Sequence, residues 1–136
     1  MSRTSRPTAG LCPCGLGRPY AECCGAFHRG PAAAPTAELL MRSRFSAFAV
    51  HDAAYLLRTW HPTTRPAQIE FDPGQQWSRL EILASADGSQ FHTEGTVEFR
   101  AHYVERGRAG SMHESSRFVR DAGGHWVYLD GKQSVS

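Results

Sequence analysis

The four cysteines of the chain lie in one short segment, CPCGLGRPYAECC, and none occurs elsewhere in the 136 residues. They form two pairs with the spacing C-x-C-x8-C-C. Four thiolates can close a tetrahedral zinc site with no open coordination position, which is the structural class of zinc site. Gly15 and Gly17 allow the tight turn that such a knuckle needs after its first pair. The expected zinc ligands are Cys12, Cys14, Cys23 and Cys24.

Disulfides and reactive thiols are the alternative uses of these cysteines. Disulfides between such near neighbours would close small, strained loops, and a reducing compartment disfavours them. Cys23 and Cys24 would point in opposite directions in an extended chain, so they must lie at a helix end or a turn to share one ion. If Cys24 faced away from the ion, His28 is the spare ligand.

The composition fits one domain of ordinary size with a small appendage. Apolar residues make up 40% of the chain, charged residues make up 21%, and the formal net charge is +2. That charge is too small to indicate nucleic-acid binding by itself. No apolar run is long enough to span a membrane, and the first ten residues, MSRTSRPTAG, do not resemble a secretory signal. We therefore expect a cytoplasmic protein.

The segment CPCGLGRPYAECCG resembles the SEC-C motif, the zinc knuckle best known from the C-terminal tail of the SecA translocation ATPase. That motif reads C-x-C-x8-C-C or C-x-C-x8-C-H, and all four cysteines match it position by position. In SecA the knuckle docks the chaperone SecB and ribosomes. The resemblance therefore implies a binding role and not catalysis.

The remaining chain is similar to the YchJ family of bacterial proteins, in which a SEC-C knuckle precedes an NTF2-like domain. The segments that carry this similarity are LLMRSRFSAF, YLLRTWHPTTRP, GTVEFRAHY, HESSRF and WVYLDG. The family implies helices packed on a curved antiparallel sheet, a cone that often leaves a pocket at its open end. Longer members carry a second SEC-C motif at the C-terminus, whereas no cysteine follows Cys24 here.

The periodicity of the chain independently predicts helices followed by an antiparallel meander, which is an α+β domain. Thr36 is the expected N-cap of a helix whose apolar face repeats at helical spacing. Asp52 is placed to cap a second helix, Ala53 to Trp60, which Pro62 ends. From Trp77 onward the pattern has period two, with turn residues between the segments. The four expected strands are Ser78–Ala86, His92–Glu105, Ser111–Asp121 and His125–Asp130.

These elements divide the chain into five segments. We expect a disordered tail over 1–10, the knuckle over 11–30, a linker over 31–35, the NTF2-like domain over 36–131 and a tail over 132–136. In the second strand, the residues expected to face the helices are Gly95, Val97, Phe99, Ala101 and Tyr103. In the third strand neither alternating set is cleanly apolar, so the sequence does not decide which set faces the helices.

The pocket that the family implies has eight polar or aromatic candidates in the predicted domain. They are Arg42, Arg44, Trp60, His61, Tyr103, His113, Glu114 and Asp130. A structural interpretation pairs Arg42 and Arg44 with Glu114 or Asp130 as ion pairs that fix the helix on the sheet. The alternative is an open pocket in which His61 and His113 serve an enzyme or a small-ligand binder. No phosphate-binding loop, nucleophile elbow or HExxH motif is present.

Together these features predict a zinc-binding adaptor, not an enzyme, whose knuckle docks a protein partner. The docking surface of the knuckle would consist of Leu11, Leu16, Tyr20 and Phe27, and it would face either the chain's own domain or a partner. RNA or ribosome contact through the knuckle has less support, because Tyr20 is its only central aromatic residue. If the chain forms a homodimer, the expected interface is the open sheet face around Arg100 and His102.

Overall fold

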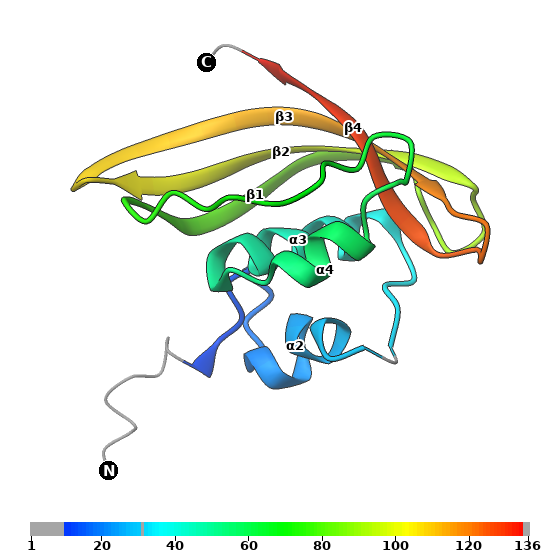
Figure 1. Ribbon diagram of the computed structural model, residues 1–136, viewed down its shortest axis with the longest axis horizontal. Coiled ribbons are helices and arrows are strands. Elements are labelled where there is room, and N and C mark those ends of the chain that lie inside the picture. The colour runs from blue at the N-terminus through cyan, green and yellow to red at the C-terminus, as the bar shows by residue number, and fades with distance from the viewer. Residues whose placement is uncertain (1–9, 31, 135–136) are drawn as a thin grey trace.

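The computed structural model describes residues 10–30 and 32–134. Residues 1–9 of the expected N-terminal tail over 1–10, residue 31 of the linker and residues 135–136 of the expected C-terminal tail lie outside it. A four-stranded sheet forms one layer, two helices lie against it, and the knuckle lies beyond the helices (Figure 1). No helix in this part of the chain is long and apolar enough to cross a membrane. The elements are η2 (Tyr20–Glu22), α2 (Cys24–His28), α3 (Ala37–Val50), α4 (Ala53–Arg58), β1 (Gln75–Asp87), β2 (Glu94–Glu105), β3 (Arg108–Arg120) and β4 (Trp126–Ser134).

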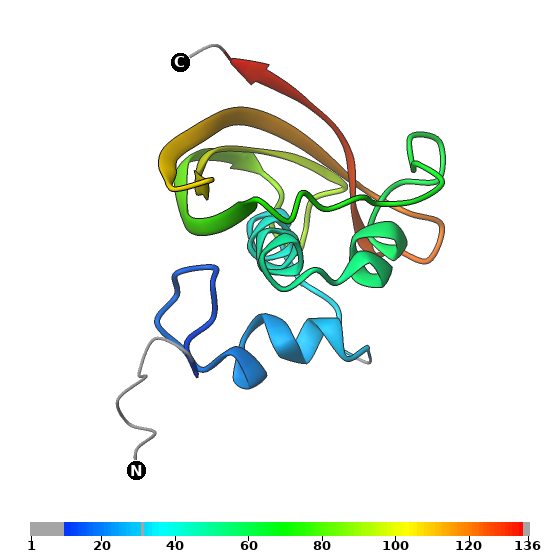
Figure 2. The same cartoon turned by 60° about the vertical axis from the view of Figure 1, so that its left-hand side comes forward.

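The sheet is an antiparallel meander in the order β1-β2-β3-β4, as the sequence predicts. The turn between β2 and β3 consists of Arg106 and Gly107, whose φ angles of 50° and 85° are typical of a tight hairpin. Register shifts interrupt the ladder twice in β1 and once in β3. Such bulges bend a sheet, and this one curls around α3 (Figure 2). The α+β cone expected from the sequence is confirmed.

The predicted helix starts are confirmed by their capping bonds. The backbone N–H of Leu39 donates to Thr36 Oγ1 at 3.1 Å, and that of Tyr55 donates to Asp52 Oδ1 at 3.0 Å. α4 ends at Arg58, two residues before the predicted end at Trp60. Trp60 instead forms an isolated parallel bridge with Tyr128 of β4. The chain leaves the helix early because its backbone pairs with the edge of the sheet.

β4 is longer than the sequence predicts. It continues to Ser134, whereas the expected strand ends at Asp130 and the expected tail begins at residue 132. The extension pairs with β3, with Gln133 opposite Glu114 in the register. Lys132 and Gln133 have no apolar pattern, so their strand state depends on the partner strand that they meet.

The covered face of β2 is confirmed, with Gly95, Val97, Phe99 and Ala101 buried and Tyr103 half-buried. The sequence does not decide which face of β3 is covered. In the structure the covered face carries Met112, Glu114, Ser116 and Phe118. Glu114 and Ser116 are therefore polar residues on the inner face of the cone. This face packs on α3, whose Leu40, Met41 and Phe45 belong to the same core.

Candidate functional site

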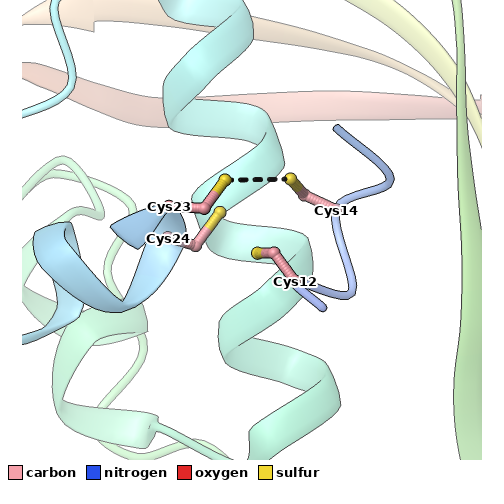
Figure 3. A group of neighbouring side chains, drawn as sticks. All are labelled: Cys12, Cys14, Cys23 and Cys24. Atoms are coloured by element: carbon pink, nitrogen blue, oxygen red, sulfur yellow. Dashed lines mark hydrogen bonds between the residues drawn. The ribbon is translucent and has the colours of Figure 1, made fainter. Parts of the chain in front are cut away.

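Two short backbone units bring the cysteine pairs together. In the first, the N–H of Cys12 donates to the carbonyl of Arg18 at 2.8 Å and so closes a loop that carries Cys12 and Cys14. Gly15 and Gly17 have φ angles of 90° and 79° in this loop, which favour glycine. In the second unit, Cys23 precedes α2 and Cys24 begins it. The helix start turns both neighbouring thiols toward the loop, as the sequence analysis requires (Figure 3).

The four thiols form one closed cluster. Their exposed fractions lie between 0% and 7%, and their sulfur atoms all lie within 4.8 Å of one another. The Sγ atoms of Cys14 and Cys23 are 3.6 Å apart, much farther than a disulfide bond, and all four cysteines are free. The cluster can hold a metal ion at its centre.

The protonation of the cluster follows from this crowding. A hydrogen bond from Cys14 holds the pKa of Cys12 below its usual value. Bonds to Cys12 raise the pKa of Cys14 to about 12 and also raise that of Cys24. Several thiolates packed together repel one another, so the set keeps protons until a cation compensates the charge. The donor chemistry thus fits a bound metal ion.

His28 lies beside the cluster but does not complete it. Its Nε2 donates to the carbonyl of Ser43 at 2.8 Å, and its Nδ1 lies 2.5 Å from the hydroxyl of Tyr20. Both ring nitrogens therefore have partners, and the fourth thiol comes from Cys24. His28 instead ties the knuckle to α3.

Arg42 belongs to the same interface and not to a pocket. Its Nη1 donates to the carbonyl of Cys14 at 2.8 Å, and its Nε donates to Glu38 Oε2 at 3.1 Å. On the neighbouring turn of α3, Ser46 Oγ lies 3.2 Å from Cys12 Sγ. The expected pairing of Arg42 with Glu114 or Asp130 is wrong, because the side chain reaches the knuckle on the opposite side of the helix.

A separate cavity of about 300 Å³ lies between α3 and the concave face of the sheet. Of the eight predicted pocket residues, it contains Arg44, Trp60 and Glu114. Its other walls are mostly aromatic or apolar. The lining residues that the sequence analysis did not identify are Met41, Phe45, Phe48, Trp77, Phe99, Ala101, Met112, Ser116, Tyr128 and Gln133. The spacing of Phe45 and Phe48 on one helix signals a shared face, but it does not show that the face borders a cavity.

Arg44 is 3% exposed and carries its charge inside the domain. Its Nη1 donates to the carbonyl of Leu56 at 2.9 Å and to Thr59 Oγ1 at 2.8 Å. The guanidinium carbon lies 4.9 Å from the ring centroid of Trp60 and 4.7 Å from that of Tyr128. Burial lowers the pKa of Arg44 to about 10, which still leaves it protonated at neutral pH. The expected ion pair with Glu114 or Asp130 is absent from residues 10–30 and 32–134, because a helix-end carbonyl and two rings surround the guanidinium instead.

Glu114 faces the same cavity from β3. Its Oε2 accepts hydrogen bonds from Ser116 Oγ at 2.6 Å and from the hydroxyl of Tyr128 at 3.2 Å. Burial, together with the nearby charge of Glu114, raises the pKa of Tyr128 above its usual range, so the phenol remains a donor. Gly131 lies opposite Ser116 in the register, and a Cβ there would overlap the Glu114 carboxylate.

The predicted histidines do not meet in this cavity. His61 bonds Thr63 Oγ1 at 2.7 Å outside it. His113 lies on the outer sheet face, where its Nε2 is 2.6 Å from Glu98 Oε2. The hypothesis of an acid–base site built on His61 and His113 is wrong, because strand alternation places His113 on the opposite face from Glu114.

Tyr103 and Asp130 also lie outside the cavity. The ring of Tyr103 packs edge-on against Trp77 with centroids 5.3 Å apart. Asp130 forms a two-pronged pair with Arg117, with N–O distances of 2.7 and 2.6 Å. Arg117 lies on β3 and Asp130 on β4, so this exposed pair links two strands and not a helix to the sheet.

Two protein-family models match this chain. The model described as YchJ, middle NTF2-like domain, matches residues 36–131, and the SEC-C motif model matches residues 11–26. Among relatives, a UPF0225 protein of Streptomyces coelicolor is 63% identical over 121 residues, covering 89% of this chain and 94% of the relative. A UPF0225 protein of Ralstonia nicotianae is 50% identical over 136 residues, covering 92% of each.

Two solved structures share the fold. A SEC-C motif-containing protein from Rhodopseudomonas palustris, solved in solution, superposes with a TM-score of 0.78 at 32% identity, covering 91% of this chain and 98% of that one. A crystal structure of a SEC-C motif-containing protein from Psychrobacter arcticus gives a TM-score of 0.72 at 28% identity, covering 93% and 84%. These matches span both the knuckle and the sheet.

Proposed function

The chain belongs to the YchJ family of NTF2-like proteins with a SEC-C motif, and on this basis we propose that it is a zinc-binding adaptor. In this proposal, the cysteine cluster holds one structural zinc ion and the knuckle docks a protein partner. The observation that carries the metal part is the set of four buried thiols within 4.8 Å of one another. Zinc bound to four thiolates needs sulfur atoms about 3.8 Å apart, which the 3.6 Å between Cys14 and Cys23 approaches.

The zinc would act as a staple and not as a reaction centre. Four protein ligands leave a tetrahedral ion no open position for a substrate. Within the knuckle only Tyr20 packs against the cluster as a partly buried hydrophobic residue, so there is little core to fold the segment without metal. A reducing compartment such as the cytoplasm would keep the thiols free to bind.

Two apolar side chains of the knuckle remain available for a partner. Tyr20 packs against the cluster and Phe27 packs against the domain core, so both serve the chain itself. Leu11 and Leu16 are 40% and 41% exposed. The exposed Arg18 follows Leu16 by two residues in the sequence. This surface suits a protein with a small apolar cleft and an acidic rim.

Replacing Leu11 and Leu16 together by serine is expected to abolish partner capture without loss of metal. The wild-type and variant chains would each be immobilised, incubated with lysate and crosslinked to the proteins that bind them. Quantitative mass spectrometry would then compare the two sets of bound proteins. The matched control replaces two exposed apolar residues of the sheet region, Leu83 and Phe91, by serine. We expect one set of proteins to fall about tenfold on the knuckle variant and to persist on the control.

Three results would contradict the docking role. The two variants could retain the same proteins, the bound set could vanish after nuclease treatment, or the captured protein could be only a second copy of the chain. The second result would indicate RNA or ribosome binding, and the third would indicate a homodimer.

A further inference from the structure

The cavity of the domain holds two charged side chains that do not pair with each other. Arg44 and Glu114 are 3% and 8% exposed, and both line the same space of about 300 Å³. Only Nη1 of Arg44 donates a hydrogen bond within the described part of the chain. Charged groups held in an apolar cavity are costly unless something compensates them, and such groups in a cavity are candidates for a binding site.

Trp60 adds an aromatic ring at the same place. Its ring lines the cavity, and its indole Nε1 is buried with no hydrogen-bond acceptor among residues 10–30 and 32–134. A buried N–H without an acceptor is rare in folded proteins. Arg44 stacks over this same ring at 4.9 Å. The N–H groups of Arg44 that lack acceptors therefore lie beside the aromatic ring of Trp60 in the cavity wall.

The other walls are suited to a flat apolar body. Phe45, Phe48 and Trp77 lie edge to face with ring centroids 6.1 to 6.4 Å apart. Met41 and Met112 complete this wall, and methionine adapts its shape to aromatic rings. A volume of about 300 Å³ lies at the small end of ligand-binding pockets.

From these contacts we propose that the cavity binds a small aromatic acid. Its carboxylate would accept hydrogen bonds from the free N–H groups of Arg44, and its ring would lie against Phe45, Phe48 and Trp77. The site is independent of the zinc proposal, because the knuckle segment lies on the side of α3 away from the sheet (Figure 2), whereas α3 and the sheet line the cavity.

Glu114 sets a second requirement on the ligand. Its Oε2 already accepts from Ser116 and Tyr128, whereas its Oε1 accepts no hydrogen bond from the described residues. A ring N–H or hydroxyl of the ligand can donate to that oxygen. The glycine at position 131 leaves room for the carboxylate there. The favoured ligand is thus an aromatic acid with one donor on its ring.

Three indoles of one shape test the proposal: indole-3-acetate, the matching alcohol tryptophol, and the matching amine tryptamine. Each is titrated into the ¹⁵N-labelled full chain while the three tryptophan indole N–H resonances are followed, with that of Trp60 assigned from a Trp60→Phe variant. We expect the acid to bind at least about tenfold tighter than the alcohol, and the Trp60 resonance to shift most. Equal affinity for acid and alcohol, preference for the amine, or no saturable binding by any of them at millimolar concentration overturns the proposal.

Two variants assign the effect to the cavity. Arg44→Lys keeps the charge but loses the planar donor fork, so acid binding should weaken by about tenfold with little change for the alcohol. Phe48→Leu removes one ring of the aromatic wall and should weaken binding of acid and alcohol alike, and it carries the test if Arg44→Lys does not fold. Arg117→Gln removes an exposed arginine outside the cavity and should leave both affinities unchanged. Unchanged acid binding in the folded cavity variants contradicts the assignment.

Discussion

Replacing Cys14 by serine is expected to remove the metal from the chain and to unfold the knuckle, while the NTF2-like domain stays folded. Cys14 is fully buried, with an exposed fraction of 0%, and its sulfur lies 3.6 Å from that of Cys23. A serine hydroxyl is a poor zinc ligand at neutral pH. Structural zinc contributes about 10–16 kcal/mol of apparent binding free energy in small zinc-finger peptides, and much of that is folding free energy. The segment around the cluster should therefore lose its order with the ion.

Metal content per chain, measured by elemental mass spectrometry, and the ¹H–¹⁵N spectrum check this result together. We expect one zinc ion per wild-type chain and almost none in Cys14→Ser, with lost resonances confined to the knuckle and the face of α3 beneath it. Ser46→Ala is the matched control, because Ser46 Oγ lies 3.2 Å from Cys12 Sγ without being a ligand. It should keep one zinc ion at an affinity lowered by about tenfold. A full equivalent of metal in Cys14→Ser would refute the four-thiolate site.

Replacing Phe118 by alanine is expected to cost the domain about 3–5 kcal/mol of its free energy of unfolding. Phe118 lies on the inner face of β3 with an exposed fraction of 0% and packs edge-on against Tyr128, with ring centroids 5.8 Å apart. The change leaves a hole between the sheet and α3 that strands paired on both sides cannot collapse to fill. Because domains of this size are stable by only about 5–15 kcal/mol, the loss is a large share of the total.

The adjacent residue on the same strand supplies the control. Arg117 points outward and pairs with Asp130 at the surface, where an ion pair contributes little to stability. Denaturant unfolding of Arg117→Ala should give a midpoint close to that of wild type, while that of Phe118→Ala falls sharply. Equal midpoints for the two variants would show that β3 does not present the face described here.

The knuckle and the meander could be predicted from the sequence because their signals are local. Cysteine spacing with two glycines defines the loop, and paired turn residues such as Arg106 and Gly107 define the hairpins. The covered face of β3 could not be predicted, because Glu114 and Ser116 place polar groups among the inward positions. The Oε2 of Glu114 accepts hydrogen bonds from Ser116 on the same strand and from Tyr128 on β4, and no sequence pattern reveals these contacts.

The pocket residues were only partly predictable for a related reason. An arginine on a helix that packs on strands with carboxylates suggests an ion pair. Arg44 instead donates to the backbone carbonyl of Leu56, an acceptor that no side-chain pattern reveals. Arg42, two residues away, points to the other side of α3 and bonds the carbonyl of Cys14. The helix thus separates two arginines into two sites, one at the knuckle and one in the cavity.

X-ray absorption at the zinc edge of the purified wild-type chain would report the ligands of the metal in the cysteine cluster. We expect one zinc ion per chain surrounded by four sulfur atoms at about 2.3 Å, with no nitrogen or oxygen ligand. A first shell with fewer than four sulfurs, or a fit that requires an imidazole from His28, would contradict the closed cysteine site.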